Sequence, residues 1–318
     1  MKRRVDLCMM LTAGIVLLSV FSGCEKDIEL ELKKEGNKKV LYSFVYPDSA
    51  LNFHYSKSVD VLSDANFKVV NKAHFKMYIN GLYQGEYFFP DGKVYGIWDD
   101  FEFSPGDKLV LKAMDDTNDT AVVSTEIPVS VPVEELDTVS SVYQGPDDIL
   151  YEVLKCNLLF TDDVLRDDFY QLVIIHERWE VIDGQEKYYL DTVDYVKDDP
   201  VFFSRSQEGT LLEGLDFHGL FDDEIINGSY SVQCLVPSSY YKLFWFDRKI
   251  KLTFYLYHHT KDYYRFVRSK LISDYYNGIP VFEPVNIYSN VTNGIGLVSG
   301  MSFTTDSLIF EQDLPATK

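Results

Sequence analysis

The sequence has few basic residues. Its 30 lysines and arginines stand against 50 aspartates and glutamates, which gives a formal net charge of −20 over 318 residues. Binding to nucleic acid needs a basic surface that neutralises phosphates and releases their counterions. The same negative charge opposes adsorption to anionic lipid. We therefore expect no nucleic-acid partner, and any membrane attachment must come from something other than charge.

Cysteine is scarce as well, with 4 in the whole chain. Cys8 and Cys24 lie near the N-terminus, whereas Cys156 and Cys234 lie where polar and apolar residues alternate. This alternation indicates strands and places the later two cysteines on apolar faces. Two buried free thiols are the usual outcome at such positions. An oxidising compartment would permit a disulfide, and the sequence does not give the distance that decides between the two states.

Recognisable catalytic motifs are missing. No nucleophile elbow, phosphate-binding loop or dinucleotide fingerprint occurs. The stretch 176–180 has part of a zinc-protease motif, but it lacks the second histidine and lies in a strand-like segment. The acidic stretch 115–119 lacks the glycine and distal glutamate of a calcium loop, so an acidic turn is favoured. Carboxylates are too numerous to single out a glycosidase pair. We expect no enzyme, no cofactor and no metal site.

The N-terminus carries the clearest signal in the sequence. A basic start is followed by an apolar run over residues 7–21, and small residues then precede Cys24. The run is shorter than a membrane span of about 20 apolar residues, and the pattern is typical of an export signal. It resembles the lipobox of bacterial lipoproteins, in which the cysteine is acylated, although Phe21 is bulkier than usual. We predict that residues 1–23 are a signal peptide and that Cys24 carries the lipid anchor; a plain secretory signal is the alternative.

Residues 24–38 are expected to form an acidic tether. In lipoproteins of the Bacteroidota, an acidic run with a lysine just after the cysteine, as at residues 25–31, resembles the signal for export to the outer face of the outer membrane. A solvated linker without such an address is an equal alternative.

From residue 39 to about 131 the hydrophobic pattern has a period of two. Asn80 and Gly81 mark a tight hairpin turn between two such stretches. Several short strands with regular turns predict an immunoglobulin-like β-sandwich over residues 39–132. Pro128 and Pro132 punctuate the chain, and we place a boundary there, followed by a β-rich C-terminal domain over residues 133–318. The fold class is therefore mainly β.

The clearest strand covers residues 249–259. Leu252, Phe254 and their i±2 neighbours form one apolar face, and the opposite face carries Tyr255 and Tyr257. These two tyrosines are our candidate ligand contacts, because their flat rings could stack on a sugar or a peptide. Ordinary packing on a sheet is the alternative explanation for both.

One helix is predicted, near residues 261–276. Thr260 is a suitable N-cap, and Asn277 begins a stop signal. The apolar residues that recur at helical spacing are Tyr263, Tyr264, Val267, Leu271 and Tyr275. An isolated helix of this length is marginal, so we expect it to fold back against the sheet that contains Leu252, Phe254 and Leu256, or to cover the edge of that sheet, with Val267 and Leu271 buried.

Several segments together resemble one family of outer-membrane lipoproteins of the Bacteroidota, domain-of-unknown-function family 4249. The segments that carry the resemblance are residues 104–106, 160–163, 167–170, 221–228, 263–266 and 283–296. The resemblance brings no established activity. It implies a surface or periplasmic lipoprotein, often encoded near TonB-dependent outer-membrane transporters.

These observations predict an outer-membrane, lipid-anchored protein, exposed at the cell surface if the tether carries its address. We expect it to bind a ligand of unknown identity and to assist a β-barrel transporter in capturing it. A structural or adhesive surface protein without a small ligand is the alternative.

Overall fold

The computed structural model describes residues 37–59, 65–115, 119–203, 215–276 and 285–312, all within a unit that spans Gly36–Lys318. The predicted signal peptide, the lipid site at Cys24 and nearly all of the tether lie outside the described residues. So does the middle of the acidic stretch 115–119.

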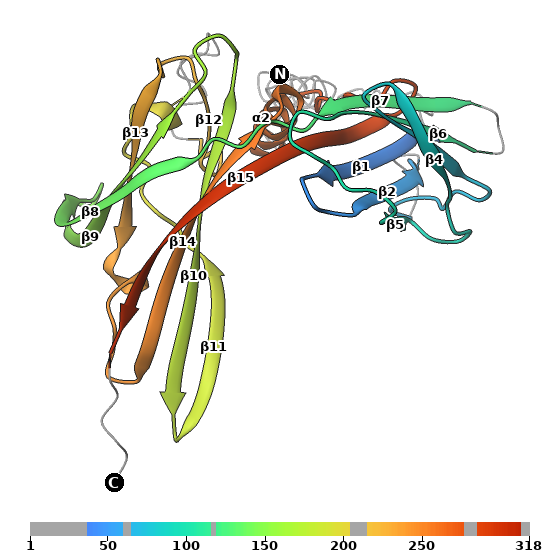
Figure 1. The fold of residues 1–318 in the computed structure, drawn as a ribbon. Helices are drawn as coiled ribbons and strands as arrows, with labels where there is room; N and C mark the ends of the chain where they lie inside the picture. The colour runs from blue at the N-terminus through green and yellow to red at the C-terminus, as the bar shows by residue number, and fades with distance from the viewer. Residues whose placement is uncertain (1–36, 60–64, 116–118, 204–214, 277–284, 313–318) are drawn as a thin grey trace, which may run out of the picture. The chain divides into compact units, whose positions relative to one another are not determined.

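The described chain is mainly β, as the alternating pattern predicted (Figure 1). The strands are β1 (Lys39–Val45), β2 (Leu51–Lys57), β3 (His74–Ile79), β4 (Leu82–Phe88), β5 (Tyr95–Trp98), β6 (Lys108–Met114), β7 (Thr120–Glu126), β8 (Val133–Gln144), β9 (Leu150–Thr161), β10 (Phe169–Ile182), β11 (Gln185–Thr192), β12 (Leu220–Asp222), β13 (Ser229–Pro237), β14 (Asp247–His259) and β15 (Ile295–Glu311). The helical elements are α2 (Lys261–Tyr276) and the short 3-10 turns Pro200–Phe202 and Ser238–Tyr240.

The strands form three sheets. The largest has eight strands in the order β11-β10-β14-β15-β1-β2-β5, with β12 added beside β10. A three-stranded sheet has the order β13-β9-β8, and a four-stranded sheet has the order β4-β3-β6-β7. Asn80 and Gly81 take positive φ angles of 51° and 81° between β3 and β4, which confirms the predicted hairpin turn.

Strand β15 joins the early and late parts of the chain. Its residues 295–300 pair in parallel with β1, and its residues 301–311 pair antiparallel with β14. Figure 1 shows it as one long red arrow that passes from β1 to β14. The predicted boundary near residue 132 stays a prediction, but this pairing ties strands from both sides of it into one sheet.

Two hydrophobic cores are packed against the large sheet. The first contains side chains of β1, β2, β3, β6 and β7, and it also takes Val298 from β15. The second contains side chains of β9, β10, β13 and β14. Alternation explains both: in β6, for example, Leu109, Leu111 and Ala113 are buried while the residues between them are not. Each core lies between two sheets, as in a β-sandwich.

Helix α2 has the predicted bounds and contacts the large sheet, on the face opposite the second core. Thr260 caps it, since its Oγ1 accepts a hydrogen bond from the Tyr263 amide at 3.3 Å. None of its side chains is buried. The Tyr263 ring stacks on His259, with centroids 3.8 Å apart. Side chains along a strand alternate between the two faces of the sheet, so His259 points away from the face that carries the core residue Leu256. The helix therefore folds back against the sheet, as expected, but the expected burial of Val267 and Leu271 was wrong, since neither side chain is buried.

The start of β15 brings two backbones together. Gly296 has a φ of 124°, and a Cβ atom built on it would lie 2.0 Å from the carbonyl oxygen of Leu41. Asn290 fixes the same stretch: its Nδ2 donates to the Val298 carbonyl at 2.8 Å and to Asp262 of α2 at 3.0 Å. Through Asn290 and Gly296, this stretch holds α2, β15 and β1 close to one another.

Candidate functional site

Tyr255 and Tyr257 lie on the face of the large sheet that points away from the second core, as predicted. They begin a series of stacked rings. The ring centroids are 5.8 Å apart between Tyr255 and Tyr257, and 5.6 Å apart between Tyr257 and His259. The ring of Tyr263 from α2 stacks on His259 and ends the series. The two predicted tyrosines are half-buried, so each ring offers part of its surface to solvent.

Phe303 of β15 completes this surface, and the sequence analysis missed it. It lies opposite Tyr257 in the register of β14 and β15. Its ring centroid is 5.4 Å from that of Tyr257 and 5.6 Å from that of Tyr255. Phe303 is 41% exposed, which makes it the most accessible member of the group. We call Tyr255, Tyr257 and Phe303 the aromatic row.

His259, which stacks on Tyr257, is uncharged near pH 7. Burial, reinforced by the adjacent His258, lowers the pKa of His259 to about 3. Its Nε2 lies 3.1 Å from Gln171 Oε1, while Nδ1 has no hydrogen-bond partner among the described residues. Burial also raises the pKa of Tyr257. The row therefore offers apolar, uncharged ring surface, in contrast with the acidic composition of the chain.

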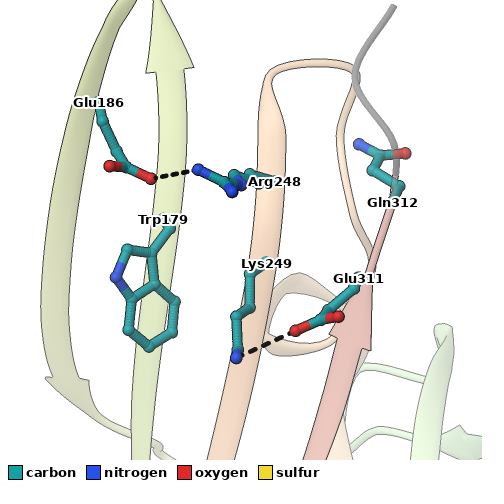
Figure 2. Close-up of a pocket in the computed structure, with 6 residues that line it drawn as sticks. All are labelled: Trp179, Glu186, Arg248, Lys249, Glu311 and Gln312. Carbon is teal, nitrogen blue, oxygen red and sulfur yellow. Dashed lines mark hydrogen bonds and ion pairs between the residues drawn. The ribbon is translucent and has the colours of Figure 1, made fainter.

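A pocket opens farther along the same strands. It has a volume of about 720 Å³. Its lining residues are Trp179, Glu186, Arg248, Lys249, Glu311 and Gln312 (Figure 2). Lys249 and Tyr255 are six residues apart on β14, so the pocket and the aromatic row are about 20 Å apart along the strand. Both belong to the same sheet face.

A β-bulge explains why Arg248 and Lys249 both reach this pocket. Trp179 pairs with Lys249, but the next residue of β10, Glu180, pairs with Asp247, which leaves Arg248 as an extra residue. Consecutive residues of a regular strand point to opposite faces, and a bulge re-aims the side chains around it. Neither hydrophobic alternation nor a motif reveals this bulge, so the sequence analysis missed the pocket.

The charges that line the pocket are paired across strands. Arg248 Nη1 lies 3.0 Å from Glu186 Oε1, and Lys249 Nζ lies 3.0 Å from Glu311 Oε1. Lys249 Nζ is also 5.5 Å from the ring centroid of Trp179. Figure 2 shows the indole ring broadside, beside both ion pairs. The lining therefore has an aromatic floor and a formal charge of zero.

A separate buried network involves the loop between β9 and β10. Tyr170 donates a hydrogen bond to Asp162 Oδ1 at 2.6 Å, and His258 Nε2 lies 3.1 Å from Asp168 Oδ1. His258 Nδ1 donates to the carbonyl oxygen of Val129 at 2.7 Å. Burial raises the pKa of Asp162. All four side chains are buried, so we assign this network to structure: it ties the loop to β14 and to the segment between β7 and β8.

The stretch 176–180 and the two histidines at the end of β14 do not form a site. His176 is buried beside Tyr240, with ring centroids 5.4 Å apart, and its strand conformation excludes the helical geometry of a zinc-protease motif. His258 and His259 point to opposite faces of β14. Within the described ranges, no group of three or more His, Cys, Asp and Glu side chains could hold a metal ion.

The fold and this surface define a class of protein: a β-rich chain with two sandwich cores and one partly exposed sheet face that carries aromatic groups. The chain belongs to the family described as a domain of unknown function (DUF4249), whose model matches residues 25–307. Comparison with curated proteins finds no match. In the part of the chain that the structure describes, no helix is both long and apolar enough to span a membrane.

Proposed function

We propose that this protein is a lipid-anchored binding or accessory protein of the outer membrane of Bacteroidota, which helps a TonB-dependent transporter to capture its ligand. The aromatic row carries the proposal. Three adjacent rings on an exposed sheet face offer apolar contact area that the second core does not use. The predicted signal peptide, followed directly by Cys24, supports the anchor, and the composition of the tether supports an outer-membrane address.

Detergent extraction from the native envelope, followed by affinity capture of the full-length protein, tests the proposal. A β-barrel transporter should co-purify, and Phe303→Ser should reduce its recovery because it removes the most exposed ring of the aromatic row. Phe88→Ser is the matched control, since Phe88 is an exposed phenylalanine on β4, far from the row in sequence. Equal recovery with both variants, or no transporter at all, would instead favour a structural or adhesive role.

The anchor has a separate test. Cys24→Ala should abolish lipid labelling and release the protein from the membrane fraction. If this variant remains membrane-bound with unchanged labelling, the lipoprotein assignment fails.

The outer-membrane address is tested on intact cells. Added protease should digest the wild-type protein, and changing Lys26, Asp27 and Glu29 to alanine should protect it. Full protection of the wild-type protein would place it in the periplasm.

A further inference from the structure

The pocket beside Trp179 combines a flat aromatic floor with charges that neutralise each other. We infer that this pocket binds an uncharged saccharide. The inference rests on the proposed function and deepens it by naming the class of ligand.

The floor of the pocket suits a sugar ring. Trp179 is half-buried and therefore held in place, and Tyr188 of β11 supports it with ring centroids 5.2 Å apart. A pyranose ring carries C–H groups on its faces and hydroxyl groups around its edge. The C–H face packs on an indole in the way that other apolar groups pack on aromatic rings.

The rim supplies both kinds of hydrogen-bonding group. Arg248 carries five N–H donors in a fixed plane, and its ion pair with Glu186 leaves both side chains more than half exposed. Glu186 and Glu311 are acceptors for hydroxyl groups. Gln312 is fixed because its Nε2 donates to the Asp247 carbonyl at 2.7 Å. Surface ion pairs of this kind contribute little to stability, so sharing them with hydroxyl groups costs the fold little.

The same arrangement disfavours other ligands. An anion would face the carboxylates of Glu186 and Glu311, and a cation would face Arg248 and Lys249. A fully apolar ligand would strip water from all of these charges without replacing its hydrogen bonds. An uncharged, hydroxyl-rich ligand avoids both costs. The volume of about 720 Å³ lies within the range of about 300–1,000 Å³ typical of small-ligand sites.

The bulge supports a binding role over a chance depression. It interrupts an otherwise continuous register of β10 and β14 at Trp179 and Glu180. Its effect is to bring Arg248 to the same side as Lys249. Bulges recur next to functional sites because they re-aim a side chain in this way.

Saturation-transfer NMR and calorimetric titration of the full-length protein in detergent test the inference. The probes are maltotetraose, cellotetraose and chitotetraose, with trigalacturonate as an acidic comparison. At least one neutral probe should bind, and more tightly than trigalacturonate. Trp179→Ala should weaken that binding about tenfold, because it removes the stacking surface.

Two further variants keep the test decisive. Arg248→Ala changes an exposed side chain, so it should fold even if Trp179→Ala does not, and it should also weaken binding about tenfold. Tyr189→Ala is the matched control, because Tyr189 neighbours Tyr188 on β11 but pairs with Arg178, on the other face of the sheet. It should leave the affinity unchanged.

The inference is overturned if none of the neutral probes binds at millimolar concentration, if trigalacturonate binds best, or if Trp179→Ala and Arg248→Ala bind as the control does. Its failure is separable from that of the proposed function. Transporter capture without saccharide binding would remove the inference alone. Saccharide binding without a transporter would remove the assisting role and leave the pocket assigned.

Discussion

Cys156 on β9 lies directly opposite Cys234 on β13, in the antiparallel register of the three-stranded sheet. Both thiols are free and buried. The hydrogen bond with Cys156, together with burial, raises the pKa of the Cys234 thiol. Because the thiolate is the form that reacts with oxidants, the folded pair should resist oxidation. A disulfide between the two cysteines should therefore form mainly during folding, before the sheet is complete.

We expect the pair to oxidise when the protein folds under oxidising conditions. Directly opposed residues on antiparallel strands have Cα atoms about 4.5–5.5 Å apart, within the range that a disulfide spans. In a chain with Cys8 and Cys24 changed to serine, refolding with glutathione disulfide should give a product lighter by two hydrogens, with Cys156 joined to Cys234. The crosslink should add about 2–4 kcal/mol to the free energy of unfolding.

Cys234→Ser is the control, since it should abolish the mass difference and the added stability together. Recovery of both thiols in reduced form after oxidative refolding would contradict the prediction.

His259 should make the stability depend on pH. Its pKa is about 3 in the folded protein, against the ordinary value of 6.5. Between these values the unfolded chain binds a proton that the folded chain does not, so stability falls as the pH drops from about 6.5 towards 3 and is fully present above that window. The loss should be on the order of 4 kcal/mol at the low end. Denaturant unfolding across this pH range measures it.

His259→Phe keeps a ring for Tyr263 to stack on and removes the titrating group, so it should flatten this part of the pH profile. A profile for His259→Phe that parallels the wild type would show that His259 does not titrate in this window.

Local alternation was enough to predict strand β14 and the shared face of Tyr255 and Tyr257, because neighbouring residues determine which way a strand side chain points. It could not identify Phe303 as their neighbour. Helix α2 and the stretch after it separate β14 from β15, so the register between the two strands is set by tertiary packing. The parallel pairing of β15 with β1 has the same cause, since its partners come from opposite ends of the chain.

The Trp179 pocket was beyond sequence analysis for a different reason. On a regular strand Arg248 and Lys249 would point to opposite faces, and one extra residue in the ladder changes that. The face on which α2 packs could not be predicted, because helical spacing shows that a stripe exists, but not which side of the sheet receives it.

The close contact at Gly296 should make that position intolerant of any side chain. Gly296→Ala would place its Cβ atom 2.0 Å from the Leu41 carbonyl oxygen, whereas Gly81, which also has a positive φ, has nothing within 4 Å of that position. Gly81→Ala should therefore cost only the backbone strain, about 1–2 kcal/mol. Gly296→Ala should cost about 1–3 kcal/mol more, because the backbones of β15 and β1 must move apart. If urea unfolding showed equal losses of unfolding free energy for Gly296→Ala and Gly81→Ala, the contact with Leu41 would add no strain.

The last prediction concerns how α2 docks on the sheet through Tyr263. Tyr263 stacks on His259 and also meets the Phe44 ring of β1, with centroids 5.9 Å apart. Leu271 is half-buried and lies outside both hydrophobic cores. Tyr263→Ala should therefore cost about 2–4 kcal/mol of unfolding free energy, and Leu271→Ala no more than about 1 kcal/mol.

Leu256→Ala provides the matched comparison for Leu271→Ala, because Leu256 is 2% exposed in the second core. The same chemical change should cost about 2–5 kcal/mol there. Urea unfolding of the full-length variants in detergent would rank the three. If Leu271→Ala proved as costly as Leu256→Ala while Tyr263→Ala was mild, the helix would be held by its aliphatic stripe and not by the ring that extends the aromatic row.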